Sequence, residues 1–358
     1  MYERYKTQMS VAQFGEQGQR RLKASSVLCV GAGGLGTAML PYLVGAGIGK
    51  IAVSDGDLVS VDNLHRQVHF DEDCIGFNKA NTLVSRLKKL NSSITLTAID
   101  ENMTMSNVMG FIEQYDVIVD ASDNVSTKLM LNDSCHRLKK PLVSASILAF
   151  EGQCGIYWAT RGPCLRCVFP NYDQGAFQNC REGGVVGTVA ALFGAIQANE
   201  TIKLCLGLQG LVGKFWMGDL LTMSFRCVQL HINPECPLCT AKDNFDKLTH
   251  SQFLSGSIMQ LQQISAQELA QILQAKEPLF LLDVRNPEEY QAYNLGGTLI
   301  PLSELPQRVN EVVKDKPIVV LCHSGYRSAQ AASFLLDSGF KDVKNLVGGV
   351  VAWQQAGL

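Results

Sequence analysis

Short apolar runs alternate with turns and amphipathic segments from residue 26 to about residue 147. The runs are rich in Val, Ile and Leu, which is typical of buried strands, and NKANTLVSRLKKL at 78–90 has the apolar spacing of a helix. Strands that alternate with helices in this way indicate a parallel sheet with helices on both faces. The predicted strands lie at residues 27–30, 50–54, 94–99, 116–120 and 140–147.

A second, shorter series of the same kind follows near the C-terminus. The segment ISAQELAQIL predicts an amphipathic helix, and LFLLDVR, IVVLC and VKNLVGG predict short buried strands. Before this series, AKDNFDKLTHSQFLSGSIMQLQQ has no sustained apolar period and predicts a linker. We therefore expect a Rossmann-like, mainly parallel α/β domain over 1–242, a linker over 243–262 and a small α/β domain over 263–358.

The composition narrows the classes of function. Hydrophobic residues make up 46% of the 358 residues, which is enough to fill sizeable cores. The formal net charge of −2 is spread along the chain, so neither nucleic acid nor a membrane is expected as a partner. No stretch resembles a signal peptide or a membrane span, and we expect a cytoplasmic protein. In that reducing compartment, twelve unevenly spaced cysteines favour metal and thiol chemistry over disulfides.

The segment VGAGGLG at 30–36 carries the first candidate site. Gly31, Gly33 and Gly36 fit the pattern G-x-G-x-x-G, with Gly34 between them, and Asp55 follows about twenty residues further on. A dinucleotide-binding dehydrogenase has the same features, with its acidic residue on a ribose. The glycine pattern alone therefore leaves a dehydrogenase and other nucleotide-binding enzymes open.

The residues after the second predicted strand favour a triphosphate. The stretch SDGDLVSVDNLHRQ at 54–67 is dense in polar and charged side chains, which hydride transfer does not need. Arg66 and Lys79 bring two cations toward the start of a glycine-rich helix, an arrangement that suits a triphosphate. Asp123 follows a strand at the carboxyl edge of the sheet, where a carboxylate can hold Mg²⁺ between phosphate oxygens.

Two Cys-x-x-Cys pairs predict a structural zinc site. PCLRC contains Cys164 and Cys167, and PECPLC contains Cys236 and Cys239. Four thiolates at this spacing suit tetrahedral Zn²⁺, and neither motif offers a further ligand or an open catalytic position. Because the pairs are far apart in the chain, we expect the metal to join distant segments.

The motifs of residues 1–240, taken in order, resemble those of the MoeB/ThiF adenylyltransferases, relatives of the ubiquitin-activating enzymes. That family uses ATP to adenylate the C-terminal glycine of a small ubiquitin-like sulfur carrier. The resemblance implies that Asp55 binds the ribose, that Asn63, Arg66 and Lys79 surround the phosphates, and that Asp123 holds Mg²⁺. The motifs are GAGGLG, SDGDLVSVDNLHRQ, which also includes Asp57 as a nucleotide-binding residue, GFNKA, DASDN and the two cysteine pairs.

One position departs from the family pattern. Members commonly carry R-Y-x-R-Q near the N-terminus, and the second Arg reaches the phosphates of the neighbouring subunit's ATP, whereas this chain has RYKTQ with Thr7 in that place. A hydroxyl cannot replace a guanidinium. The sequence leaves three explanations open: Lys6 or Arg4 supplies the charge, adenylation is slower, or the contact is dispensable.

Another cysteine, Cys180, lies in the polar and glycine-rich stretch NYDQGAFQNCREGGVVG, with Arg181 beside it to favour the thiolate. It resembles the family's loop cysteine, which attacks the activated carrier or resolves a mixed disulfide. The resemblance therefore implies a relay or resolving thiol. By contrast, Cys29, Cys205 and Cys227 lie in apolar runs and are expected in the core.

The C-terminal domain has its own signature, LCHSGYRSAQ at 321–330. A strand delivers Cys322 into a tight loop whose backbone N–H groups can point at an anion, with Arg327 closing the loop. Together with LLDVRNPEEY, GGTLIPLSEL and LVGGVVAW, this segment resembles a rhodanese domain, which passes sulfane sulfur as a cysteine persulfide. Four residues separate Cys322 from Arg327, whereas related dual-specificity phosphatases have five, so sulfur transfer is favoured over phosphoryl transfer.

The two domains together resemble molybdopterin-synthase sulfurylases with a rhodanese tail. The expected enzyme is a homodimer that uses ATP, Mg²⁺ and Zn²⁺. It adenylates a carrier ending in Gly-Gly and converts it to a thiocarboxylate with sulfur from Cys322, which a persulfide donor loads. A scaffold that docks ubiquitin-like partners without turnover and a NAD-dependent dehydrogenase are the alternatives. No residue discriminates among carriers for molybdopterin, thiamine, tRNA thiolation and cysteine synthesis.

Overall fold

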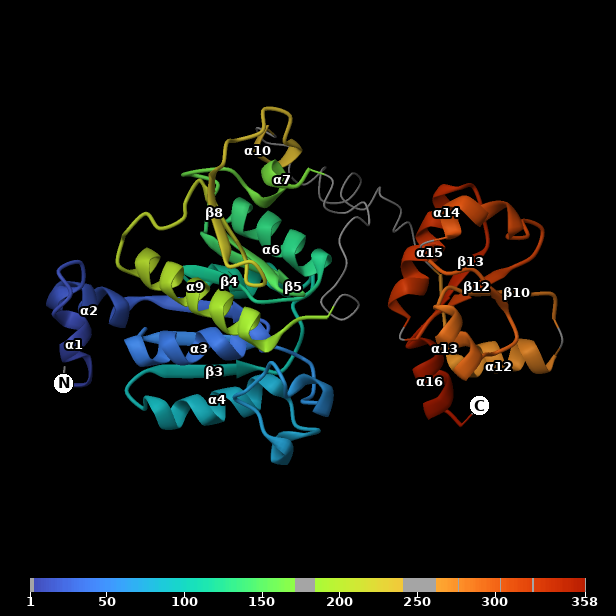
Figure 1. Cartoon of the computed structure of the whole chain (residues 1–358), viewed down its shortest axis with the longest axis horizontal. Helices are drawn as coiled ribbons and strands as arrows, with labels where there is room; N and C mark the ends of the chain where they lie inside the picture. Colours follow the sequence, from blue (N-terminus) through green and yellow to red (C-terminus); the bar gives the residue numbers. More distant parts are fainter. Residues whose placement is uncertain are drawn as a thin grey trace. The chain divides into compact units, whose positions relative to one another are not determined.

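The computed structural model describes residues 3–170, 184–240 and 262–357, apart from residues 276, 303 and 324. The chain divides into two compact units, residues 1–243 and 244–358. Figure 1 colours the elements of the first from blue to yellow and those of the second from orange to red. Each unit has its own sheet and its own hydrophobic core. No helix within the described ranges is long and apolar enough to cross a membrane.

The first unit is built around an eight-stranded sheet in the order β3-β2-β1-β4-β5-β6-β7-β8. The first five strands in this order are parallel, and the last three continue the sheet as antiparallel strands. The predicted mainly parallel sheet is confirmed. Its strands are β1 (Ser26–Val30), β2 (Lys50–Ser54), β3 (Thr95–Ile99), β4 (Val117–Asp120), β5 (Leu142–Leu148), β6 (Glu151–Tyr157), β7 (Lys214–Asp219) and β8 (Ser224–Gln229).

Helices cover both faces of this sheet (Figure 1). Val27 and Cys29 of β1 pack with residues of α3, α4 and α9, whereas Leu28 and Val30 pack with residues of α5 and α6. Strands that are buried on both faces need apolar side chains at every position, which explains the continuous apolar runs. These helices are α3 (Gly34–Ala46), α4 (Lys79–Leu90), α5 (Val108–Glu113), α6 (Val125–Arg137) and α9 (Gly187–Cys205).

Short helical segments complete the first unit, and one of them, α2, contributes Leu22 to the core. Two others, α7 and α10, lie beside the cysteine pairs. The segments are η1 (Glu3–Tyr5), α1 (Lys6–Met9), α2 (Gly15–Ala24), η2 (Val61–Asn63), η3 (Glu72–Cys74), α7 (Leu165–Val168) and α10 (Pro237–Thr240).

The last strand of the sheet, β8, is exposed along its whole length. Cys227 lies in this strand and is exposed, so the expectation that it belongs to the core is wrong. Its apolar neighbours Phe225 and Val228 are exposed as well. An apolar run therefore indicates a buried strand only when the fold covers it, and β8 lies at the edge of the sheet. Cys29 and Cys205 are buried, as predicted.

The second unit has a five-stranded parallel sheet in the order β11-β10-β12-β13-β9. The predicted helix and three strands are confirmed, and β9 and β11 add the two edges. Its strands are β9 (Gln262–Ile264), β10 (Phe280–Asp283), β11 (Thr298–Leu299), β12 (Ile318–Leu321) and β13 (Val343–Leu346). Its helices are α12 (Ala266–Gln274), α13 (Pro287–Ala292), α14 (Leu305–Arg308), η4 (Val309–Glu311), α15 (Tyr326–Asp337) and α16 (Gly349–Gln355).

Candidate functional site

The carboxyl ends of β2, β1 and β4 form the edge at which the predicted nucleotide residues lie. The chain passes from β1 through α3 to β2 on one side, while β4 pairs with β1 on the other side, so the strand order reverses between β1 and β4. Ligands of open α/β sheets bind at such a switch point. The glycine loop, residues 31–36, follows β1. Asp55 follows β2, and Asp123 lies just after β4.

Close packing explains the glycines of the loop. Gly31 has a φ of 103°, and a Cβ at this residue would lie 2.6 Å from the carbonyl oxygen of Ala121. A Cβ at Gly36 would lie 2.1 Å from the carbonyl oxygen of Gly31. Gly33 is the N-cap of α3 and offers no side-chain cap. A helix start of this kind presents its first N–H groups to an anion.

Asp55 is fixed against the glycine loop. Its carboxylate accepts hydrogen bonds from the backbone N–H groups of Ala32 at 2.7 Å and Asp57 at 2.9 Å. Burial raises the pKa of Asp55, and these two N–H groups act in the opposite direction. Lys79 is buried at the start of α4, and its ammonium pairs with Asp57 at 3.0 Å. These contacts join Asp55, Asp57 and Lys79 into one network beside the loop.

The segment after β2 also approaches the start of α3. A Cβ at Gly34 would lie 3.7 Å from the Cγ of Arg66, and one at Gly33 would lie 3.8 Å from the Nε2 of Gln67. Buried Asn63 accepts a hydrogen bond from Gln67 at 2.9 Å. Motif spacing does not single out Gln67, yet it is buried and its Oε1 has no hydrogen-bond partner among the described residues. A buried amide oxygen in this state is a group that a bound ligand would satisfy.

A buried ion pair that the sequence does not reveal lies at the end of β4. The carboxylate of Asp120 accepts hydrogen bonds from Lys128 at 2.9 Å and from Ser144 at 2.6 Å. Its other oxygen accepts the backbone N–H of Ser122 at 3.0 Å. These contacts fix the turn that leads to Asp123, which is exposed at the carboxyl edge of the sheet. The only sequence signal for the pair is an aspartate that ends an otherwise apolar strand.

The N-terminal residues around the family's arginine position lie on the surface. Thr7 is exposed in α1. The guanidinium of Arg4 donates to the carbonyl of Leu90 at 2.9 Å, and Lys6 pairs with Glu3 at 2.7 Å. Both cations that were candidates to replace the missing arginine therefore have partners within the chain itself.

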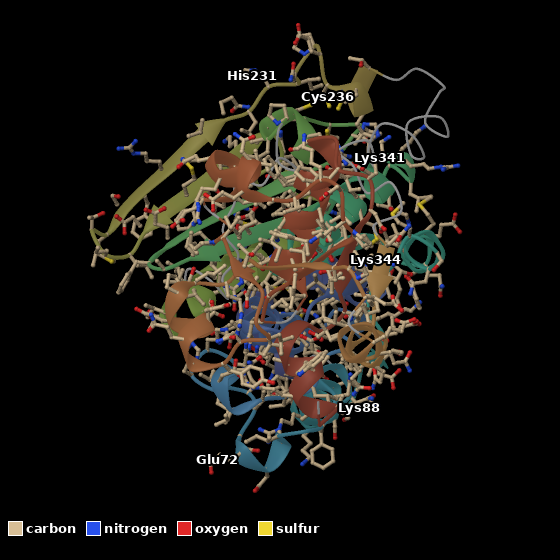
Figure 2. The ribbon with its side chains drawn as sticks, turned by 90° about the vertical axis from the view of Figure 1, so that its right-hand side faces the viewer. Glu72, Lys88, His231, Cys236, Lys341 and Lys344 are labelled. Atoms are coloured by element: carbon tan, nitrogen blue, oxygen red, sulfur yellow. The ribbon has the colours of Figure 1, made fainter. Side chains whose placement is uncertain are left out.

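The four predicted zinc ligands lie together. Their Sγ atoms are all within 4.8 Å of one another, with Cys164 and Cys236 at 3.6 Å and Cys167 and Cys239 at 3.4 Å. Thiolates around tetrahedral Zn²⁺, with bonds of about 2.3 Å, stand about 3.8 Å apart, so the cluster fits this ion. Figure 2 labels Cys236 on the segment that follows β8 and precedes α10.

Hydrogen bonding within this cluster lowers the pKa of two thiols, and the pKa of the other two, Cys164 and Cys239, is raised. Hydrogen bonding with Cys164 lowers the pKa of Cys236 to about 6 and also lowers the pKa of Cys167. Cys164 donates a hydrogen bond to Cys167, and this hydrogen bond raises the pKa of Cys164. A central cation would stabilise all four thiolates at once. The first pair is held in place because Arg166 of α7 pairs with Asp133 of α6 at 2.8 Å.

Cys180 and Arg181 lie outside the described residues, and so does most of the predicted linker. The relay or resolving role of Cys180 therefore stays a prediction. The described chain resumes at residue 184, and Val185 forms a bridge with Ala149, next to β5 and β6. Val185, next to the point where the described chain resumes, therefore lies in the first unit.

The loop of the second unit begins at Cys322, which follows β12 directly and is fully buried. The hydroxyl of Ser328 donates to its Sγ at 3.3 Å. The backbone N–H of Val350 donates to the Cys322 carbonyl at 2.9 Å, and a Cβ at Gly349 would lie 2.3 Å from that oxygen. The glycine pair in LVGGVV is therefore needed because its backbone passes close to the loop that begins at Cys322 and ends at Arg327, here called the thiol loop. The motif reveals Cys322, but it does not reveal the hydrogen bond from Ser328.

Arg327 is held by a glutamate that the motif does not identify. Its guanidinium donates to both carboxylate oxygens of Glu289 in α13, each at 2.7 Å. The hydrogen bonds from Arg327 hold the pKa of Glu289 at about 2, well below its usual value. The expectation that Arg327 closes the loop over an anion stays a prediction, and a carboxylate of the chain itself binds the same guanidinium.

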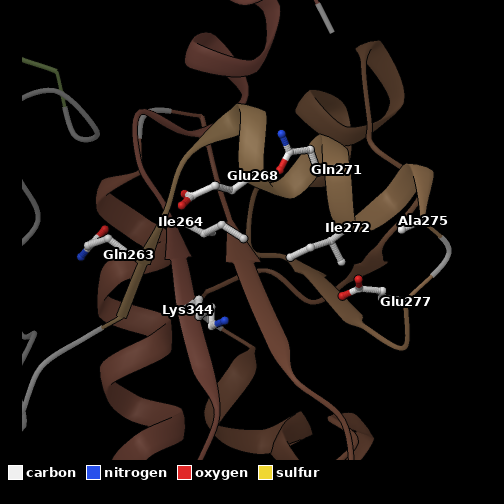
Figure 3. Close-up of a pocket in the computed structure, with 8 residues that line it drawn as sticks. All are labelled: Gln263, Ile264, Glu268, Gln271, Ile272, Ala275, Glu277 and Lys344. Carbon is white, nitrogen blue, oxygen red and sulfur yellow. The ribbon is translucent and has the colours of Figure 1, made fainter.

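A separate pocket lies at the edge of the second sheet, between α12 and the strands β9 and β13 (Figure 3). It has a volume of about 410 Å³. Its lining does not include Cys322, Arg327 or Glu289, so this pocket is distinct from the thiol loop. The residues that line it are Gln263, Ile264, Glu268, Gln271, Ile272, Ala275, Glu277 and Lys344.

Comparisons with known proteins agree with this division of the chain. The model of the ThiF family matches residues 5–238, and the model of the rhodanese-like domain matches residues 265–356. Relatives named adenylyltransferase and sulfurtransferase MOCS3 from Aedes aegypti and Arabidopsis thaliana are 37% and 36% identical to this chain. Both similarities cover 98% of this chain, and they cover 86% and 82% of the relatives. The resemblances predicted for the two domains are thereby confirmed.

Solved structures show the same fold. A crystal structure of E. coli MccB with ATP is 24% identical, has a TM-score of 0.56 and covers 62% of this chain and 69% of its own. E. coli MccB with MccA-N7isoASN is 22% identical, has a TM-score of 0.59 and covers 67% of this chain and 74% of its own. Because the two family models match residues 5–238 and 265–356, and the relatives match 98% of the chain, the chain belongs to the ThiF family and carries a C-terminal rhodanese-like domain.

Proposed function

We propose that this chain uses ATP to adenylate the C-terminal glycine of a small ubiquitin-like sulfur carrier and converts it to a thiocarboxylate with sulfur from Cys322. The observation that carries the proposal is the presence, in one chain, of a charged network at a glycine loop and a buried thiol at a second loop. The adenylyltransferase and sulfurtransferase relatives support both halves. A dehydrogenase would explain only the glycine loop.

In the first step, the carrier carboxylate attacks the α-phosphorus of ATP, and pyrophosphate leaves with the electrons of the broken P–O bond. The carboxylate is already ionised, so the chain has only to orient the reactants and neutralise the charge of the leaving group. Asp55 binds the ribose, and the glycine loop, Asn63, Arg66 and Lys79 bind the phosphates. Asp57 orients the Lys79 ammonium, which it contacts at 3.0 Å.

Two metal ions complete the proposal. Asp123, next to the glycine loop at the switch point, would hold Mg²⁺, which neutralises phosphate charge when it is bound. The cysteine cluster would hold one structural Zn²⁺ per chain, because its sulfur atoms already have the spacing of a tetrahedral site. Elemental analysis of fresh protein is expected to give one zinc per chain. The ligands are Cys164, Cys167, Cys236 and Cys239.

The second step uses the thiol loop. The Cys322 thiolate attacks the terminal sulfur of a persulfide donor, and the donor's thiolate leaves. The terminal sulfur on Cys322 then attacks the carbonyl carbon of the acyl adenylate, and AMP leaves. The hydroxyl of Ser328 donates a hydrogen bond at 3.3 Å to the Sγ of Cys322, the sulfur atom that makes the first attack. Cys180 serves as the relay or resolving thiol: its thiolate attacks the Sγ of Cys322, an S–S bond forms between the two cysteines, and the carrier thiocarboxylate leaves with the electrons of the broken S–S bond. A thiol reductant of the cell then reduces the Cys180–Cys322 disulfide.

We also propose that two copies of the chain form a homodimer. Large apolar side chains are exposed on the segment that carries the nucleotide residues, and a second copy would remove them from water. Light scattering is expected to give twice the chain mass of 39.1 kDa. The exposed side chains are Leu58, Val61, Val68, Ile75 and Phe77.

The cytoplasm is the proposed compartment. The cysteines within the described ranges are free thiols. A reducing compartment keeps such thiols available for metal binding and sulfur transfer.

The test of the proposal is carrier-dependent ATP–pyrophosphate exchange, measured with small proteins ending in Gly-Gly from the same cell. Arg66→Ala is expected to slow exchange about 100-fold, which corresponds to about 3 kcal/mol, as for the loss of one preorganised donor to developing charge. Cys322→Ala is expected to leave exchange unchanged and to prevent thiocarboxylate formation, which mass spectrometry of the carrier detects.

Two outcomes would contradict this division of labour. One is loss of exchange in a folded Cys322→Ala chain. The other is thiocarboxylate formation by that variant at the normal rate without added sulfide. Bound nicotinamide, or activity without ATP, would favour a dehydrogenase instead. A chain that binds the carrier but shows no exchange would be a scaffold.

A further inference from the structure

The ion pair between Glu289 and Arg327 gives the second unit a property that the motif does not predict. Both side chains are partly exposed, at 30% and 19%. The pair is bidentate, with two bonds of 2.7 Å, which is among the strongest and most directional contacts between side chains. The guanidinium of the motif LCHSGYRSAQ, that of Arg327, is therefore paired with a carboxylate.

We propose that Glu289 determines which sulfur donors Cys322 accepts. By neutralising Arg327, it weakens the attraction for thiosulfate, a dianion, and favours donors of lower charge, such as persulfides carried on thiols. This inference rests on the proposed sulfur transfer at Cys322. Because Arg327 holds the pKa of Glu289 at about 2, the carboxylate is ionised across the physiological range.

Both classes of donor react at the same sulfur atom of the protein. With thiosulfate, the Cys322 thiolate attacks the outer sulfur, a new S–S bond forms, and sulfite leaves with the electrons of the broken S–S bond. With a persulfide, the thiolate attacks the terminal sulfur, and the donor's thiolate leaves with the electrons of that bond. Neither step needs another reactant. The donors differ in the negative charge that has to approach the loop.

The neighbouring ion pair, between Arg285 and Asp283, is buried and does not face solvent. Arg285 and Asp283 are 3% and 1% exposed, their side chains are joined at 2.6 Å, and Arg285 also donates to the carbonyl of Tyr293 at 2.7 Å. Both charges are therefore fixed within the core of the unit. Glu289, by contrast, lies at the border with solvent, where its charge acts on an approaching ion.

A single substitution removes this charge with little other change. Besides binding Arg327, the Glu289 carboxylate accepts the backbone N–H of Asn286 at 3.1 Å as part of a capping box. Glutamine serves equally in a capping box and retains an oxygen that accepts from a guanidinium. Glu289→Gln therefore tests the charge while it preserves the start of α13.

The experiment compares thiosulfate with methanethiosulfonate, a donor of similar shape that carries one negative charge instead of two. With Glu289→Gln in the full chain, we expect the KM of thiosulfate to fall about sevenfold and that of methanethiosulfonate about threefold, the size of the effect that a unit charge exerts across about 7 Å of water. We expect kcat to stay unchanged. In 1 M salt, both effects should largely disappear, because screening shortens the range of the charge.

Two matched variants isolate the charge of Glu289. Glu288→Gln removes the same charge from an exposed residue of the same helix and should change neither KM by more than about twofold. Glu289→Asp keeps the charge and should keep the wild-type ratio of the two KM values.

Two results would overturn the inference: unchanged KM values in Glu289→Gln, or equal changes for both donors that do not depend on salt. Either result would indicate a structural contact only. A wild-type chain in which mass spectrometry finds no persulfide on Cys322 after treatment with either donor or with a cysteine persulfide would overturn the proposed sulfur transfer instead.

Discussion

Two loops in this chain follow one plan and differ in how they treat negative charge. Each joins the carboxyl end of a buried parallel strand to a helix, β1 to α3 in the first unit and β12 to α15 in the second. At the first loop, Lys79 pairs with Asp57, and the guanidinium of Arg66, whose Cγ lies near Gly34, donates to the backbone carbonyl of Asp62. At the second loop, the cation Arg327 is matched by Glu289. The strand–loop–helix plan therefore provides a place for a ligand, and residues from elsewhere in the fold decide which charge it accepts.

The two loops also differ in whether they supply a nucleophile for the proposed reaction. The first loop, with Gly31 and Gly36, carries no nucleophile, because the proposed reaction takes its nucleophile from the carrier. The second loop holds Cys322, which is fully buried at the end of its strand. Both loops need glycine, but for different backbone contacts: Gly36 packs against its own loop, whereas Gly349 belongs to a separate segment that passes the Cys322 carbonyl.

Loss of the proposed zinc is expected to have the largest effect on this comparison, because the cysteine cluster belongs to the first unit. Cys236→Ser should lose the metal and about 10 kcal/mol of folding free energy, which is as much as a typical domain has in total. We expect loss of ATP–pyrophosphate exchange, while Cys322 still accepts sulfur. Elemental analysis, thermal unfolding and the two activities measure these effects.

Cys227→Ser is the matched control for the zinc experiment. It replaces the same residue type in the first unit, but at an exposed position on β8 outside the cluster. We expect wild-type zinc content and stability. Full zinc content in Cys236→Ser would contradict the four-thiol site, and loss of sulfur acceptance in that variant would contradict the independence of the two loops.

A smaller effect is expected from Gly36→Ala, which tests whether close packing maintains the first loop. The added Cβ would lie 2.1 Å from the carbonyl oxygen of Gly31, so the loop or the helix has to move, at a cost of about 3 kcal/mol. Gly110→Ala is the control, because a Cβ there meets nothing within 4 Å. In helix α5 this control should gain about 0.5 to 1 kcal/mol. Denaturant unfolding of both variants measures the difference, and equal stabilities would show that the loop tolerates a side chain.

The smallest expected effect is the pH dependence of the Glu289–Arg327 pair. The pKa of Glu289 is about 2 in the folded chain and about 4.5 when unpaired, so the folded state favours the ionised carboxylate. Its contribution to stability is complete above pH 4.5 and is lost as the pH falls toward 2. Because the pair is partly exposed, we expect it to contribute only about 1 kcal/mol.

Glu289→Gln isolates this contribution. Its unfolding free energy should lie about 1 kcal/mol below that of the wild type at pH 6 and should approach it near pH 2 to 3. Glu288→Gln, which alters an exposed neighbour, should follow the wild type at each pH. A gap between wild type and Glu289→Gln that stays constant across this range would mean that the charge of Glu289 does not account for the difference.

Much of the fold follows from local pattern. The strands β1, β2, β4 and β5 of the first unit are predictable because they are buried on both faces and are therefore mainly apolar, whereas β3 lies at the sheet edge and alternates between polar and apolar positions. The antiparallel strands β6, β7 and β8 were not predicted as strands. The exposed strand β8 shows why, because Cys227 and its apolar neighbours look like core residues in the sequence and lie at a sheet edge.

The family, the order of the two units, the glycine loop and the four cysteines can all be identified from the sequence alone. Each of these depends on residue types at short, fixed spacings, which local backbone geometry and metal coordination demand. The pairing of the charges, in contrast, follows from the packing of distant elements. Lys128 binds Asp120 in the core, and Arg327 binds Glu289, 38 residues away in the chain. The energy of such pairs depends on distance and burial, and both arise only when separate elements pack together.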